Sequence, residues 1–155
     1  MEYIGIIHSP FREIENMPIQ PRGARGIEGT VHVYEPYVQG LEDLDGFSHI
    51  YLIYRFHQAT KTSLLVTPFM DTRQRGVFAT RSPLRPNHIG LSIVRLQRID
   101  QGVLTVKGVD VIDGTPLLDI KPYIEKFDAV AHSTSGWMTA TTEEVSKKRS
   151  DNRFK

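Results

Sequence analysis

A loop between two apolar segments carries the side chains best suited to binding an anion. It spans Thr80–His88 and contains two arginines, Arg81 and Arg85. Pro83 and Pro86 fix their own φ angles and favour an extended backbone at the residues before them. Ordinary hairpin loops are shorter and use Asn-Gly or Asp-Gly pairs. We therefore predict a stiff loop that positions both arginines at a ligand site, since rigid loops between strands commonly carry binding residues.

Arginine is concentrated around this loop. The segment Thr72–Ile99 contains six arginines and no acid, although the whole chain has a net charge of only +1. Arginine forms planar, two-pronged contacts with phosphate and carboxylate groups, which lysine cannot do. Arg95 and Arg98 are equally consistent with a solvated strand face. The candidates for contact with a nucleic-acid backbone are Arg73, Arg75, Arg85 and, further along the chain, Lys121.

Short apolar and alternating runs predict an all-β fold. The strands must position the loop, and they are joined directly rather than through helices, which favours an antiparallel barrel or sandwich. The run 47–57 is apolar enough to be a central strand buried on both faces. The expected strands cover 3–8, 30–34, 47–57, 64–67, the end of a strand at 77–79, 89–98, 103–111 and 117–123.

Few helices are expected. Val38, Leu41 and Leu44 are spaced three apart between acids, which predicts a short helix that ends at Gly46. Residues 143–155 are polar and basic and predict at most a frayed helix. We therefore expect a barrel domain over 1–130 and an irregular tail over 131–155.

Other loops also carry candidate site residues. Residues 11–29 form a long loop in which Pro21-Arg22-Gly23 combines stiffness, hydrogen-bond donors and room for a ligand, although an ordinary flexible loop is an equal alternative. His57-Gln58 ends a strand and offers a ring and an amide to an adenine or ribose edge, unless His57 is structural. Gly108 interrupts a strand, which indicates a bulge or the close approach of another group.

Composition sets the remaining limits. At 155 residues the chain is long enough for one domain with a real core, and its 39% hydrophobic and 24% charged content is typical of a globular protein. No apolar run is long enough for a membrane span. The chain has no cysteine, which is consistent with the cytoplasm, and its six histidines lack zinc-binding spacing, so we expect no metal site.

Two long motifs, ATRSPLRPNHIG and VDVIDGTPLLDIKPY, resemble the signature of the TrmO/YaeB-like family, and IGIIHSPF and LDGFSHIYLIYRFHQ support the resemblance over residues 3–125. It implies an S-adenosylmethionine-dependent methyltransferase that acts on the exocyclic N6 amine of threonylcarbamoyladenosine beside the anticodon of tRNA. It also implies a single-sheet, mainly antiparallel β-barrel with long functional loops and few short helices, working as a homodimer in the cytoplasm.

The same resemblance assigns roles to residues. Asn87 and Tyr123 are the candidates for holding the target amine, while Leu91 would pack on the donor's adenine and Asp110 would accept from its ribose hydroxyls or face its amino group. Arg85 and Lys121 would face the nucleotide, although a structural contact between Asp119 and Lys121 is the alternative. The candidate donor-binding residues are Pro21, Arg22, Gly23, His57, Gln58, Arg81, Leu91, Lys107, Gly108, Val109 and Asp110.

Three other functions fit the residues. A non-catalytic RNA-binding barrel would need an exposed aromatic platform, a methyltransferase could use a different acceptor, and a structural barrel could simply have ordered loops. Bacterial members of the family continue into a further C-terminal domain that is thought to help with tRNA, whereas this sequence stops at Lys155. We therefore expect the basic region and tail to engage tRNA alone or as a dimer, with strong salt dependence.

Overall fold

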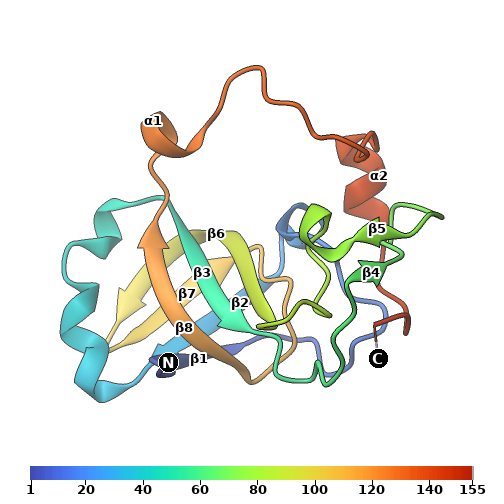
Figure 1. Cartoon of the computed structure of the whole chain (residues 1–155). Helices are drawn as coiled ribbons and strands as arrows, with labels where there is room; N and C mark the ends of the chain where they lie inside the picture. Colours follow the sequence, from blue (N-terminus) through green and yellow to red (C-terminus); the bar gives the residue numbers. More distant parts are fainter. Residues whose placement is uncertain (155) are drawn as a thin grey trace.

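The computed structural model describes residues 1–154, so Lys155 of the predicted basic tail lies outside the described residues. Six antiparallel strands close into a barrel in the order β1-β2-β7-β6-β3-β8 (Figure 1). Two short strands, β4 (Leu65–Val66) and β5 (Arg75–Gly76), pair outside it. The barrel strands are β1 (Gly5–His8), β2 (Glu28–Val33), β3 (His49–Arg55), β6 (Ile89–Asp100), β7 (Val103–Lys107) and β8 (Thr115–Pro122).

Alternating side chains explain why these strands close around a core. Along β3, Ile50, Leu52 and Tyr54 are buried, while the residues between them are only partly buried. Ile7 of β1 and Leu104 of β7 are fully buried in the same cluster. Each such side chain contributes about 1.5–3 kcal/mol by leaving water. The barrel interior is therefore packed with side chains.

The remaining regular structure consists of short helices. Two of them, η2 (Glu35–Leu41) and η3 (Leu44–Gly46), lie between β2 and β3. The others are η1 (Pro21–Ala24), η4 (Val77–Ala79), α1 (Glu125–Asp128) and α2 (Thr142–Lys147). None of the helices among residues 1–154 combines the length and the apolar content that a bilayer span requires.

The C-terminal segment returns to the body of the molecule. Figure 1 shows it leaving α1 and arching across to α2, which packs against η1. Helix α2 begins with a capping box, in which the Thr141 hydroxyl and the Glu144 carboxylate each accept from the other's backbone N–H. Beyond it, the backbone N–H of Ser150 donates to the Met17 carbonyl oxygen over 2.8 Å. Residues near the end of the chain are thus held against residues 14–24.

A second apolar cluster fixes this arrangement. Phe154 is only 8% exposed and packs with Val66 and Val77. Its ring meets the ring of Phe69 edge-on, with 4.8 Å between the centroids. The guanidinium of Arg153 lies over the Phe69 ring and donates to the Pro68 carbonyl oxygen. This cluster joins the end of the chain to β4 and η4, outside the barrel.

The predicted all-β barrel is confirmed, but several local predictions were wrong. Residues 77–79 form the helix η4 rather than the end of a strand, because the Thr80 N–H bonds back to the Val77 carbonyl oxygen. The strand over 47–57 alternates instead of being buried on both faces, since one of its faces lies outside the barrel. The strand from Val103 ends at Lys107, because Gly108 takes a φ of +94° and turns the chain. The helix expected over 36–46 is two 3-10 helices.

Candidate functional site

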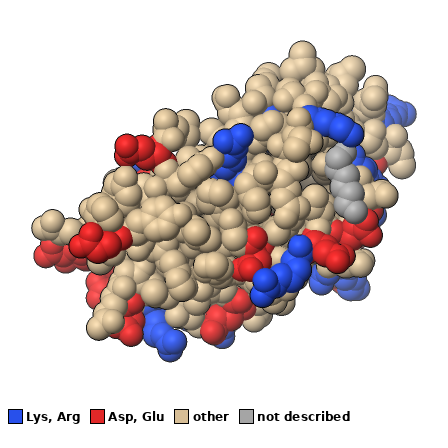
Figure 2. Space-filling model, turned by 90° about the horizontal axis from the view of Figure 1, so that it is seen from below, with Lys and Arg blue, Asp and Glu red and all other residues tan. Residues whose placement is uncertain are grey.

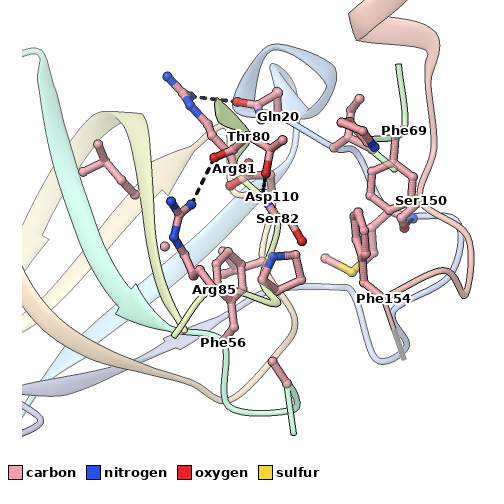
Figure 3. A pocket seen from close by; sticks show the side chains of 18 of the residues that line it. Gln20, Phe56, Phe69, Thr80, Arg81, Ser82, Arg85, Asp110, Ser150 and Phe154 are labelled. Atoms are coloured by element: carbon pink, nitrogen blue, oxygen red, sulfur yellow. Dashed lines mark hydrogen bonds between the residues drawn. The ribbon is translucent and has the colours of Figure 1, made fainter. Parts of the chain in front are cut away.

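A cavity of about 1000 Å³ lies where one end of the barrel meets the outlying segments (Figure 3). Its walls come from the ends of β3 and β6, the loop 80–85, residues 14–20 and the C-terminal segment. Ligand pockets in proteins typically fall between about 300 and 1000 Å³. The cavity is therefore large enough for a nucleoside-sized ligand, and residues far apart in the sequence build it together.

The loop predicted to be stiff forms one wall and is held by its own hydrogen bonds. The Thr80 hydroxyl donates to the Val77 carbonyl oxygen over 2.8 Å and accepts from the Ser82 backbone N–H over 3.2 Å. The Ser82 hydroxyl in turn accepts from the Leu84 backbone N–H. His88 Nδ1 lies 2.8 Å from the Pro83 carbonyl oxygen. These bonds and the prolines fix the shape of the loop.

Polar groups are gathered on this side of the cavity. The guanidinium of Arg81 donates to Gln20 Oε1 over 2.9 Å, a contact that joins residues 61 positions apart. Arg85 donates to the Thr80 carbonyl oxygen over 3.2 Å. Figure 3 shows Gln20, Arg81 and Asp110 close to one another on this side. A ligand here meets two guanidinium groups, an amide and a carboxyl group.

Asp110 is the acidic member of this polar wall. Burial raises the pKa of its carboxyl group to about 6, and the Ser92 hydroxyl and the Arg81 guanidinium oppose that rise. The group is therefore ionised at neutral pH but titrates close to it. On the same cavity, burial lowers the pKa of His57, so its ring is neutral at neutral pH. The wall thus offers an anion, cations and neutral hydrogen-bonding groups.

The opposite side of the cavity is mainly apolar, although Ser150 also lies there. Figure 3 places Phe69 and Phe154 there, and the lining also includes Met17, Met70 and Trp137. Sulfur and aromatic groups of this kind pack well against flat rings. The two sides together suit a ligand that has a charged end and an aromatic end.

Of the predicted donor-binding residues, several line this cavity. Their side chains come from the end of β3, the stiff loop, the start of β6 and the segment after β7. These residues are His57, Gln58, Arg81, Leu91 and Asp110, together with Arg85 from the predicted nucleotide-facing group.

The remaining donor-binding candidates form a neighbouring group that is not among the described lining residues. Gly108 donates its N–H to the Ile27 carbonyl oxygen over 2.9 Å, and a Cβ built on it would lie 3.8 Å from the Pro21 carbonyl oxygen. Val109 is buried in the barrel core. Arg22 donates to the Thr142 hydroxyl of α2. The group comprises Pro21, Arg22, Gly23, Lys107, Gly108 and Val109, and it supports the wall at Gln20 and Asp110 through adjacent backbone.

The predicted amine-holding residues lie apart from each other. Asn87 is exposed at the end of the stiff loop, two residues before β6 begins. Tyr123 follows β8, and its ring lies 5.8 Å from the Tyr51 ring and 6.4 Å from the His49 ring. The described cavity lining contains neither Asn87 nor Tyr123. Their assignment to the target amine stays a prediction.

The predicted backbone-binding residues have varied surroundings. Arg75 donates to the Asp71 carboxylate over 2.7 Å and lies over the Trp137 ring. Lys121 forms the contact with Asp119 that the sequence left open, at 3.0 Å. Arg73 is exposed. On the face shown in Figure 2, lysines and arginines are interspersed with acids rather than gathered into one patch.

Sequence reasoning missed Gln20, Tyr54 and Trp137, which also line the cavity. Gln20 and Trp137 lie in segments without a periodic pattern, so nothing local marks them. Tyr54 was placed correctly in a strand but treated only as core. Ser92, which contacts Asp110, could have been found, because it is the one polar side chain among the inward positions of β6.

No group of three or more histidine or acidic side chains that could hold a metal ion occurs within residues 1–154. The features that remain are the cavity, its stiff arginine loop and a carboxyl group that titrates near neutrality. These features are set on a closed barrel and not on a parallel sheet.

Comparison with known proteins identifies the family. A family model described as the tRNA-methyltransferase O N-terminal domain matches residues 6–129. A probable S-adenosyl-L-methionine-binding protein of Pyrococcus abyssi is 50% identical over 151 residues, which cover 97% of this chain and 82% of that protein. The tRNA (adenine(37)-N6)-methyltransferase of Escherichia coli is 36% identical over 146 residues, which cover 88% of this chain and 62% of the enzyme.

The solved structures agree with this result. The crystal structure of TrmO from Pseudomonas aeruginosa matches with a TM-score of 0.73 and 42% identity, over 87% of this chain and 60% of that chain. This chain therefore spans about three fifths of the length of these two bacterial relatives. Because the family model covers most of the sequence and the structural match has the same barrel, the chain belongs to the tRNA-methyltransferase O family.

Proposed function

We propose that this protein is an S-adenosylmethionine-dependent methyltransferase that methylates the N6 amine of adenosine 37 in tRNA, and that this adenosine carries a threonylcarbamoyl group. Membership of the family and the name of the Escherichia coli relative support the reaction. The name of the Pyrococcus relative supports the methyl donor. The observation that carries the proposal is the cavity, with its polar and apolar sides, beside the stiff arginine loop.

The residues of the cavity fit this methyl donor. Arg81 and Gln20 suit its carboxylate, Asp110 suits its ammonium or ribose hydroxyls, and the apolar side suits its adenine. The donor supplies a methyl group on a positively charged sulfur. An amine nitrogen can attack the methyl carbon in line and displace the sulfur as a neutral thioether. The chain's own residues have to align donor and acceptor and exclude water. They need not include a strong base, because the amine can release its proton after the new bond has formed.

We further propose that the protein works as a homodimer. Leu91 and Ile93 of β6 are 46% and 40% exposed on the outer face of the barrel. They pair in register with Ile53 and Tyr51 of β3, which makes one apolar surface. Leu91 and Ile53 also line the cavity, so a second copy on this surface would lie beside the donor. Light scattering should give twice the monomer mass, and Ile93→Glu should give the monomer.

The reaction is tested with purified protein, the methyl donor and tRNA. Transcripts with and without threonylcarbamoyl at position 37 are compared, and their nucleosides are analysed by mass spectrometry. We expect one added methyl group at N6 of the threonylcarbamoylated adenosine. Methylation of unmodified adenosine 37 would contradict the proposed threonylcarbamoylated acceptor but would still support a tRNA methyltransferase. Binding of RNA without donor binding or methylation would favour the RNA-binding barrel.

A tRNA substrate and a chain without cysteine also support a cytoplasmic location.

A further inference from the structure

Three hydrogen-bonding side chains run in line from the barrel interior to the cavity. The Tyr54 hydroxyl lies 3.0 Å from Ser92 Oγ, and Ser92 Oγ lies 2.6 Å from Asp110 Oδ1. Tyr54 and Ser92 are only 4% and 3% exposed, so water has little access to this line. Asp110 is its one acidic member. The Asp110 carboxyl group in the cavity wall is therefore held by Ser92, and through it by Tyr54, from the barrel core.

The strand pattern explains why these residues meet. The inward positions of β6 are Gly90, Ser92, Val94 and Leu96, and Tyr54 lies opposite Gly90 on β3. A Cβ built on Gly90 would lie 2.6 Å from Tyr54 Cζ, which is too close for a real side chain. The Tyr54 ring therefore packs directly against the backbone of β6 at Gly90, in the space that a side chain would fill. The tyrosine hydroxyl reaches Ser92 because this position has no side chain.

The number of available protons determines which group donates in each of these hydrogen bonds. An ionised carboxylate only accepts hydrogen bonds, so the single Ser92 hydroxyl proton goes to Asp110. Ser92 Oγ can then only accept from the Tyr54 hydroxyl. Burial raises the pKa of Tyr54, so the phenol keeps its proton at neutral pH. Each proton in the line is used once, and each donor strengthens the next.

Few other charges act on Asp110. The positive charge of the Arg81 guanidinium, on the stiff loop, lowers the pKa of Asp110. The titratable group on β3 that interacts with Asp110 is Tyr54. His57 and Arg85 line the same cavity. Ser92 favours the charged form of Asp110, because its hydroxyl bonds to the carboxylate. Loss of the Ser92 hydroxyl should thus move the titration of Asp110 to higher pH.

We propose that Ser92 and Tyr54 are positioning residues that hold Asp110 as an ionised acceptor for the N–H or O–H groups of the methyl donor. The inference rests on the proposed function, because it needs the donor to occupy this cavity. It goes further by assigning roles in donor binding to two residues of the barrel core. Neither side chain has to touch the donor, since both act through Asp110.

The test is calorimetric binding of S-adenosylhomocysteine, the stable demethylated product, between pH 5 and 8.5. For the wild type we expect affinity to fall as pH decreases through about 6. Ser92→Ala should weaken binding about tenfold at pH 7.5 and move the midpoint of the pH profile upward. Tyr54→Phe keeps the ring and should shift both quantities in the same direction by less. Asp110→Asn should bind weakly and with little pH dependence.

Thr105→Val is the matched control, because it removes another buried hydroxyl of the barrel, on β7. It should keep the affinity and the pH profile of the wild type. If Ser92→Ala fails to fold by circular dichroism, Ser92→Cys retains the volume with a weaker donor and is expected to show the same shift. Wild-type affinity and an unmoved pH midpoint in folded Ser92 and Tyr54 variants would overturn the inference alone. Failure of the wild type to bind the product at any pH would overturn the inference together with the proposed function.

Discussion

The indole Nε1 of Trp137 donates a hydrogen bond to the backbone carbonyl oxygen of Ala79 over 2.8 Å. This bond joins the arch between α1 and α2 to the residue that precedes the stiff loop by one position. Trp137 and Ala79 both line the cavity. The C-terminal segment thus acts directly on the geometry of the site, although 58 positions separate the two residues.

Replacing Trp137 by phenylalanine should loosen this connection. Phenylalanine keeps an aromatic ring under Arg75 but cannot donate to Ala79. We expect S-adenosylhomocysteine to bind about three- to tenfold more weakly, which corresponds to the loss of one hydrogen bond. Calorimetry measures the affinity, and limited proteolysis should show faster cleavage within residues 129–141. Unchanged affinity and unchanged cleavage would mean that the bond does not hold the arch.

Arg81→Ala should remove a guanidinium from the polar wall and release Gln20. We expect product affinity to fall by about tenfold or more, because hydrogen bonds to charged groups are stronger than neutral ones. Arg98→Ala is the matched control, since Arg98 belongs to the same arginine-rich segment but lies exposed on β6, outside the described cavity lining. Equal losses in the two variants would indicate a general effect of charge and not a contact in the cavity.

Phe154→Ala should destabilise the protein, because it empties the second apolar cluster. The expected loss is about 2–4 kcal/mol in the free energy of unfolding, measured by urea denaturation. Phe127→Ala serves as the control, since Phe127 is 79% exposed and its loss should change stability little. Product binding should also weaken for Phe154→Ala, since this ring is part of the cavity wall. Similar stability of both variants would show that the end of the chain adds nothing to the fold.

Asp110→Asn should weaken ligand binding but increase the free energy of unfolding. Burial raises the pKa of Asp110 from 3.8 to about 6, so between these values the folded state binds more protons than the unfolded state. Folding stability therefore falls as pH rises through this window, and the full cost is present above pH 6. The neutral asparagine avoids it and should stabilise the ligand-free protein by roughly 1–3 kcal/mol at pH 7.5.

The same comparison contains its own control. At pH 4 most of the Asp110 carboxyl groups are protonated in the folded state, so thermal unfolding of the wild type and the variant should nearly coincide. Melting curves at pH 4 and 7.5 check this. A variant that is less stable than the wild type at pH 7.5 would contradict the idea that the charge of Asp110 is costly.

The sequence predicted what local chemistry determines. The stiffness of the loop 80–88 follows from two prolines and from hydroxyl groups that bond within a few residues, and the structure contains those bonds. The barrel strands follow from alternation. The contact between Arg81 and Gln20 joins two loops without any periodic pattern, so only the folded chain brings them together. The same holds for Phe154 and Phe69, whose residue types gave no indication that the tail packs.

The walls of the cavity come from residues near both ends of the chain, including Met17 and Gln20 near its start and Ser150 and Phe154 near its end. A nascent chain whose residues 145–154 are still inside the ribosomal exit tunnel can close most of its barrel but lacks one wall of the cavity. Binding of a ligand in this cavity therefore begins only after residues 145–154 have emerged and docked.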